Sequence, residues 1–90
     1  MKIKATELIA AGKTKEAIAL LDKEIATTQS CKDDELFYLR GNAYRKEANW
    51  QQALNNYLEA INLNSKSPAV EAHRMLMDIL EFFNKDMYNQ

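Results

Sequence analysis

The residues that could carry out covalent or acid–base chemistry are few in this chain and do not form a constellation. His73 is the one histidine and Cys31 the one cysteine. A lone histidine supplies neither a catalytic triad nor a multi-histidine metal site. A lone cysteine forms no disulfide framework, and we interpret Cys31 as a free structural thiol.

Three acidic residues stand together at Asp33, Asp34 and Glu35, and they are the other place where a metal ion might be sought. Their spacing does not match a calcium-binding loop. Carboxylates at the start of a helix instead complement the positive end of its dipole. The chain also lacks a glycine-rich loop that would hold phosphate. We therefore expect no metal, no cofactor and no enzymatic activity.

A second group of residues has the chemistry of binding. Tyr38, Asn42 and Arg45 follow one another at i, i+4 and i+7, so on a helix they share one face. This face offers an aromatic ring, an amide and a guanidinium. Two interpretations stay open at this point: a surface that contacts a partner, or an ordinary solvated helix face.

The elements that must position these residues are helical. Ala, Leu, Glu, Lys, Gln and Met are abundant, the chain has only Gly 2 and Pro 1, and no segment alternates as a strand does. Five helices are expected, over residues 3–11, 15–26, 35–47, 50–63 and 68–83, with a loop at 27–32. Thr14, Asp33 or Asp34, Asn49 and Ser67 are the expected N-caps, and Ser67 precedes a proline.

Charge and hydropathy restrict the classes of partner that the chain could bind. The net charge is −1, from 12 basic and 13 acidic residues that are mixed along the chain, which argues against nucleic acid as the main partner. No stretch is long and apolar enough for a signal peptide or a membrane span. We expect a cytoplasmic protein that binds neither nucleic acid nor membrane.

A period of 36 residues runs through the first two thirds of the chain. The motif positions of the second part echo those of the first at this offset, as Gly12 and Ala48, Thr14 and Trp50, Ala17 and Ala53, Leu21 and Tyr57, and Glu24 and Ala60, with small residues kept at the first and third pair. A fixed period of this size indicates a repeat array in which helical hairpins stack on one another.

Small and aromatic residues within this period resemble the tetratricopeptide repeat family. The second repeat carries the closer match, at Gly41, Tyr44, Trp50, Ala53, Tyr57 and Ala60, and the first a weaker one, at Ala5, Leu8, Gly12, Ala17, Leu21 and Glu24. The resemblance implies one domain over 1–90, built as an α–α superhelix. Its parts would be repeats at 1–33 and 34–67, a C-terminal capping helix at 68–83 and a tail at 84–90. Tyr44, Trp50 and Tyr57 would fill the space between helices.

The same resemblance implies a function. Members of this family bind peptides or proteins in a concave groove lined by the first helix of each hairpin, and the chain would be an adaptor or scaffold. The implied groove residues are Lys2, Thr6, Tyr38, Asn42, Arg45 and Lys46. One subset of the family clamps a C-terminal carboxylate, and Lys2 fits its pattern. The remaining clamp positions are occupied here by Thr6, Leu39, Glu71 and Met75, so that type of ligand is not expected.

The fifth helix has more apolar surface than one neighbour could cover. Glu71, Arg74, Asp78 and Glu81 form a single charged stripe with possible internal ion pairs, and most of the remaining circumference is apolar. Val70, Met77 and Phe82 are a possible interface. Three alternatives stay open: the tail 84–90 folds back over this surface, two copies pair through it as a homodimer, or another protein covers it.

Overall fold

The computed structural model describes residues 2–27 and 33–88, the last of these, 83–88, by their backbone alone. The chain folds into five α-helices: α1 Lys2–Ala10, α2 Thr14–Thr27, α3 Asp34–Lys46, α4 Trp50–Leu63 and α5 Ala69–Tyr88. The described residues include no strand, and the predicted all-α class is confirmed. Residues 28–32 of the predicted loop, with Cys31, lie outside the described residues.

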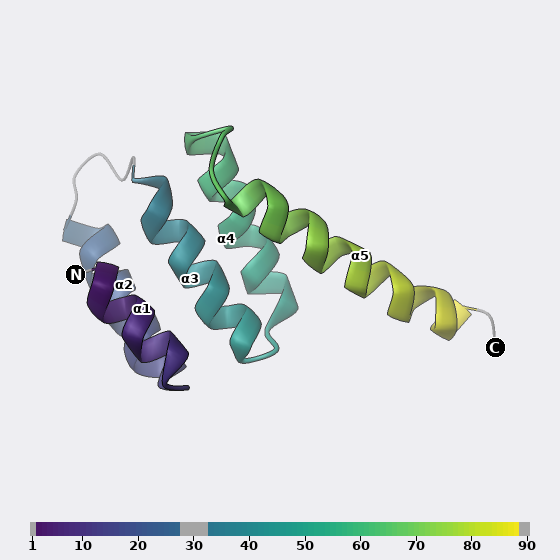
Figure 1. The fold of residues 1–90 in the computed structure, drawn as a ribbon, viewed down its shortest axis with the longest axis horizontal. Helices are drawn as coiled ribbons and strands as arrows, with labels where there is room; N and C mark the ends of the chain where they lie inside the picture. Colours follow the sequence, from purple (N-terminus) through teal and green to yellow (C-terminus); the bar gives the residue numbers. More distant parts are fainter. Residues whose placement is uncertain (1, 28–32, 89–90) are drawn as a thin grey trace.

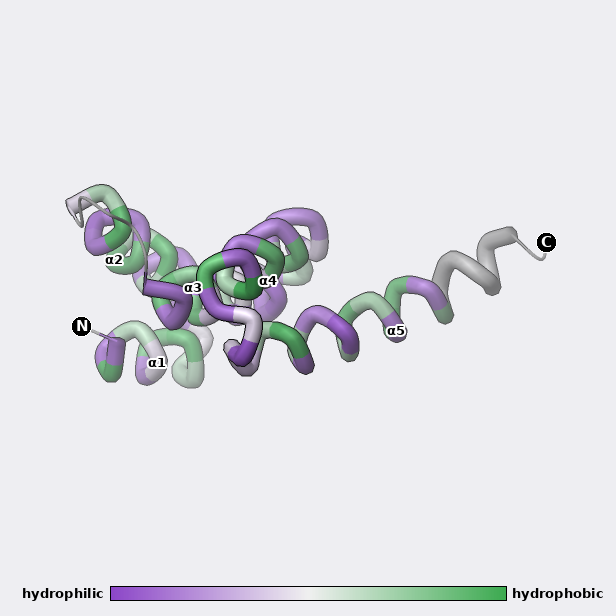
Figure 2. Tube along the Cα trace, turned by 90° about the horizontal axis from the view of Figure 1, so that it is seen from above, coloured by the Kyte–Doolittle hydropathy of each residue, from purple (hydrophilic) through white to green (hydrophobic). Residues whose placement is uncertain are grey.

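The helices form two antiparallel hairpins followed by a single helix (Figure 1). α3 is central and packs against α1, α2 and α4, whereas α5 packs against α4. In Figure 2, α2 and α4 lie on one side of α3, and α1 and the start of α5 lie on the other. No described helix is long and apolar enough to cross a lipid bilayer.

The 36-residue period is visible in the backbone. α4 begins and ends 36 residues after α2, at Trp50 and Leu63 against Thr14 and Thr27. Both turns that precede these helices contain a residue in the left-handed region, at φ +82° for Gly12 and φ +63° for Ala48. Glycine adopts this conformation without strain, whereas alanine does so at a cost.

Small residues let the paired helices approach closely, as the spacing predicts. Ala17 and Leu21 of α2 are fully buried, and so are Ala53 and Tyr57, which lie 36 residues later in α4. A Cβ atom on Gly41 would lie 2.7 Å from the Tyr57 ring. Glycine is therefore required at Gly41 by the contact with this ring, not by its backbone angles.

Polar contacts also tie one hairpin to the next. The Arg40 guanidinium lies 5.3 Å over the Phe37 ring and donates to Asp22 of α2 and Asn56 of α4, both at 2.7 Å. The Thr14 hydroxyl donates to Oε2 of Glu47 at 2.8 Å. The prediction of Thr14 as an N-cap was wrong, because α2 begins at this residue and its hydroxyl is used between hairpins.

Two of the other predicted N-caps are confirmed. Of the two aspartates considered, Asp33 is the N-cap of α3, and its carboxylate accepts from the Glu35 backbone N–H at 3.1 Å. Asn49 caps α4 through the N–H of Gln52. α5 begins at Ala69, one residue later than predicted, and the Ser67 hydroxyl accepts from the N–H of Ala69 at 3.0 Å.

The end of α5 differs from the prediction. The helix continues to Tyr88 instead of ending near Phe83, and it points away from the hairpins (Figure 1). The alternative in which the tail folds back over α5 is therefore wrong for residues 84–88. No glycine or proline occurs in this segment to end the helix. Residues 89 and 90 lie outside the described part.

Candidate functional site

A groove runs along α3 on the side opposite α2 and α4, with α1 and α5 as its walls. It consists of three hollows of about 580, 340 and 450 Å³. The first and the middle hollow share Tyr38 and Pro68, and the middle and the last share Asn42 and Arg45. Because neighbouring hollows share walls, the groove is continuous from the N-terminal to the C-terminal end of α3.

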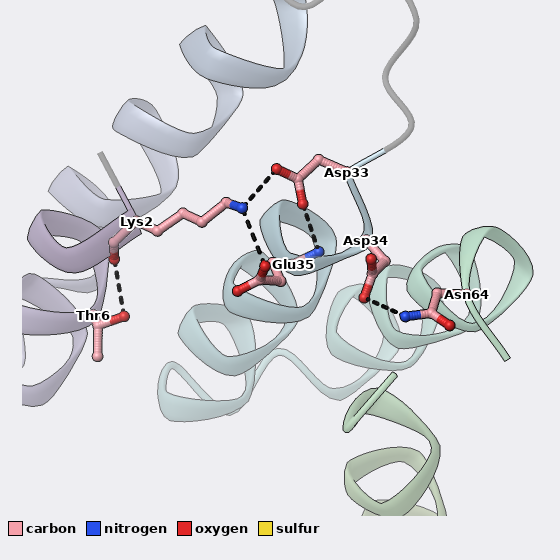
Figure 3. Close-up of polar contacts among 6 residues, drawn as sticks. All are labelled: Lys2, Thr6, Asp33, Asp34, Glu35 and Asn64. Carbon is pink, nitrogen blue, oxygen red and sulfur yellow. Dashed lines mark hydrogen bonds and ion pairs between the residues drawn. The ribbon is translucent and has the colours of Figure 1, made fainter. Parts of the chain in front are cut away.

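The N-terminal end of the groove is acidic. Glu7, Asp34 and Glu35 line it together with Lys2. The Lys2 ammonium lies 2.7 Å from Asp33 and 3.2 Å from Glu35 (Figure 3). The hydrogen bond to Asp33, followed by the one to Glu35, raises the pKa of Lys2. The positive charge of Lys2 is therefore paired with carboxylates of the same chain.

Thr6 extends this end of the groove but uses its hydroxyl locally. The hydroxyl donates to the backbone carbonyl of Lys2, one turn earlier in α1, at 2.9 Å (Figure 3). Across the hollow, the Asn64 amide donates to Asp34 at 3.4 Å and links the end of α4 to the start of α3.

The middle of the groove is supported from below by the core. Tyr38 and Asn42 line it, with Ala72 and Met75 on the opposite wall. The hydroxyl of the buried Tyr57 donates to Oδ1 of Asn42 at 2.6 Å. Asn42 is half-buried, so its face of α3 is not simply a solvated helix face.

The C-terminal end of the groove combines cations with apolar side chains. Arg45 and Lys46, in the last turn of α3, line it with Ile9, Asn42, Trp50, Leu76 and Ile79. Trp50 is 41% exposed. The prediction that this side chain fills the space between helices was wrong. Trp50 begins α4, and its ring lines the mouth of the hollow.

The exposed apolar residues of α5 lie on two flanks of its buried strip, which contains Ala69 and Leu76. At about 100° per residue, Val70 and Met77 share one flank. Met75, Ile79 and Phe82 follow at i, i+4 and i+7 and share the other flank, which borders the groove through Met75 and Ile79. The predicted interface of Val70, Met77 and Phe82 is therefore not one surface.

Comparison with known structures places this arrangement in a family. The chain is similar to the Bacteroides fragilis protein BF1650, whose solution structure was solved by NMR. The two are 50% identical over 100% of this chain and 90% of that one, with a TM-score of 0.87. The chain belongs to the family of BF1650. No protein-family model and no curated protein matches it.

Within this BF1650-like fold, the structure brings together all six residues that the resemblance implied for a groove. Lys2 and Thr6 line the first hollow, Tyr38 the first two, Asn42 and Arg45 the last two, and Lys46 the last. The positive charge of the groove is confined to its C-terminal end, because Lys2 is paired with carboxylates.

Sequence reasoning did not place Ile9, Trp50 and Ile79 in the groove. The exposure of Trp50 had no signal in the sequence, because its position matches a packing position of the resembled family. The i, i+4 spacing of Met75 and Ile79 was a usable signal, but the direction in which that flank faces depends on the angle of α5.

The groove offers hydrogen bonds, charge and apolar contact. In the described part of the chain, no three His, Cys, Asp or Glu side chains are grouped to hold a metal ion. The described groove residues can contact the side chains of an extended peptide through all three kinds of interaction.

Proposed function

We propose that this protein is a non-enzymatic interaction module, a cytoplasmic adaptor or scaffold that binds an extended peptide segment of a partner protein in the groove along α3. The observation that carries the proposal is the continuity of the three hollows, which share Tyr38, Pro68, Asn42 and Arg45. The resemblance to tetratricopeptide repeats supports the same function.

Exposed apolar side chains add to this argument. Ile3, Met75, Ile79 and Trp50 are between 41% and 76% exposed, and each lines one of the hollows. Apolar residues gathered in a concave surface between polar ones are typical of an interaction site. Burial of such surface contributes about 25 cal/mol per Å², which a bound peptide would gain.

A selection from a random peptide library on the intact protein tests the proposal. Peptides that bind the unmodified protein are then measured against Met75→Arg, which places a large charged side chain in the middle hollow, and against Leu58→Arg as a matched control. Met75 and Leu58 are 52% and 46% exposed, and Leu58 lines none of the three hollows.

Peptides that lose binding to Met75→Arg and keep it with Leu58→Arg support the groove as the site. Peptides that bind both variants equally, or a selection that yields no binder, count against it. Circular dichroism and thermal unfolding confirm that both variants keep the helical fold.

A homodimer is the second candidate, and the flank of α5 that faces away from the groove favours it. Val70 and Met77 are 42% and 43% exposed there and lie seven residues apart. Apolar residues at this spacing form a strip along a helix that a second helix can cover. Light scattering at high micromolar concentration tests it, with Met77→Glu as the disrupting variant. A monomer at all concentrations would rule the dimer out.

A further inference from the structure

The hollow at the C-terminal end of the groove has a composition unlike the rest of the surface. Its described lining is Ile9, Asn42, Arg45, Lys46, Trp50, Leu76 and Ile79. Two of these side chains are cationic and none is a carboxylate. The hollow at the opposite end has three carboxylates and one lysine that is already paired with acidic side chains. The groove is therefore polarised along α3.

The two cations at this end are not neutralised by a carboxylate of the described residues, and the Arg45 guanidinium lies beside the Tyr57 hydroxyl. Within residues 2–27 and 33–82, where side chains are described, Lys2, Arg40 and Arg74 each form an ion pair with a carboxylate, and Arg45 and Lys46 form none. Glu71, which lines the middle hollow next to Arg45, is paired with Arg74. The dipole of α3 favours cations in its last turn, but it does not explain why apolar side chains surround them.

The apolar part of the hollow has a floor and an open rim. Leu76 is 2% exposed, whereas Trp50 and Ile79 are 41% and 46% exposed. The volume of about 450 Å³ is within the range of ligand-binding pockets, about 300–1,000 Å³. A side chain inserted here would cover both exposed residues at once.

We infer that this hollow binds an acidic segment of the partner, with one apolar side chain inserted between Trp50 and Ile79 and neighbouring carboxylates against Arg45 and Lys46. The inference rests on the proposed function and names the chemistry of its ligand. Charge complementarity selects the partner's chemistry. A basic segment in this hollow would be repelled by Arg45 and Lys46, and an acidic segment at the other end of the groove would be repelled by Glu7, Asp34 and Glu35.

Trp50 makes the inference directly testable, because it is the chain's one tryptophan and it lines the hollow. Three capped peptides of about ten residues, free of tryptophan and tyrosine, serve as probes. The first has a central leucine flanked by glutamates in a Gly–Ser background. The second replaces the glutamates by lysines, and the third replaces the leucine by serine. Each is titrated into the full chain while the emission of Trp50 is followed, and binding is measured independently by anisotropy.

The glutamate–leucine peptide is expected to shift the Trp50 emission to the blue and to bind about fivefold to tenfold more tightly than the lysine peptide at low salt, as expected for two partly exposed charge pairs. This preference should shrink at high salt, where charges are screened over a few ångströms. The serine peptide should bind at least about tenfold more weakly, because it loses the burial of one apolar side chain.

Variants locate the charge contact. Arg45→Gln with Lys46→Gln is expected to abolish the preference for glutamate over lysine, and Arg45→Glu with Lys46→Glu to reverse it. The matched control is Lys15→Gln with Lys23→Gln, which removes the same charge from the exposed surface of α2 and should leave the preference unchanged.

The inference is overturned if the lysine peptide binds as tightly as the glutamate peptide, or if the glutamate peptide binds without changing the emission of Trp50. If library peptides depend on Met75 while either of these results holds, the proposed function stands and the inference alone fails. If no peptide of any charge binds in the groove, both fail.

Discussion

The hydroxyl of Tyr57 donates to Oδ1 of Asn42 at 2.6 Å, and this bond joins the core of the protein to its groove. Tyr57 is fully buried in α4, while Asn42 lines two of the three hollows. The ring that fills the contact between the helices of the second hairpin therefore also orients the amide at the centre of the candidate site.

Replacing Tyr57 by phenylalanine removes this bond and leaves the ring in place. We expect the free energy of unfolding at neutral pH to fall by about 1 kcal/mol, the usual net value of a hydrogen bond. Urea unfolding measures it. Tyr44→Phe is the control, because the Tyr44 hydroxyl makes no hydrogen bond with the described residues and its loss should have little effect. Equal effects of the two changes would contradict the prediction.

The same bond has a pH dependence. Burial raises the pKa of Tyr57 above its ordinary value of 10.0, and the nearby Arg45 guanidinium offsets part of the rise. A raised pKa in the folded state means that the neutral hydroxyl contributes stability below about pH 10, which is lost as the pH rises through the folded value. The difference in unfolding free energy between the unmodified protein and Tyr57→Phe should therefore shrink above pH 10. A constant difference up to pH 11 would argue against it.

Gly41→Ala tests the closest contact between α3 and α4. Alanine is the better helix former by about 1 kcal/mol, but its Cβ would lie 2.7 Å from the Tyr57 ring. Because overpacking a tight core contact costs about 1–3 kcal/mol, we expect a net loss of stability. In a Tyr57→Leu background the ring is gone and the loss should disappear, so a double-mutant cycle measures the coupling. Additive effects would show that the ring does not cause the loss.

Substitutions at Gly12 and at Ala48, which lie 36 residues apart, should change the free energy of unfolding in opposite directions. Both have positive φ, and nothing lies within 4 Å of a Cβ built on Gly12. Gly12→Ala should therefore destabilise by about 1–2 kcal/mol through backbone strain alone. Ala48→Gly relieves such strain and should stabilise by up to about 1 kcal/mol.

Thermal unfolding compares these two variants with Ala19→Gly, an exposed position within α2, where glycine should cost about 1 kcal/mol. If Ala48→Gly destabilises the protein as much as Ala19→Gly does, the positive φ of Ala48 is not a source of backbone strain.

Arg40→Met keeps an unbranched side chain over Phe37 but removes the donors to Asp22 and Asn56. Asn56 is 4% exposed. Its unpaired Oδ1 should cost about 1–3 kcal/mol. Asp22→Ala removes only the exposed ion pair and should cost less than about 1 kcal/mol. Denaturant unfolding of both variants separates the two contacts, and a larger effect of Asp22→Ala would reverse this ranking.

The sequence by itself determined the helices, their order and the close contact inside the second hairpin. The reason is local: capping residues such as Asp33 and Asn49 define helix starts. A 36-residue spacing of small and large residues, as in Ala17 and Ala53, defines which faces pack. These signals depend on neighbouring residues along the chain, so they can be read without the fold.

Only the tertiary structure decided which polar and apolar side chains remain available to a ligand. Lys2 is held by Asp33 and Glu35, residues that lie more than 30 positions away along the chain. Trp50, at the start of α4, is 41% exposed and lines a hollow together with residues of α1, α3 and α5. Pairing and exposure depend on how the helices cross, and no local pattern specifies that angle. The cations that no described carboxylate pairs and the exposed Trp50 therefore meet at the C-terminal end of α3.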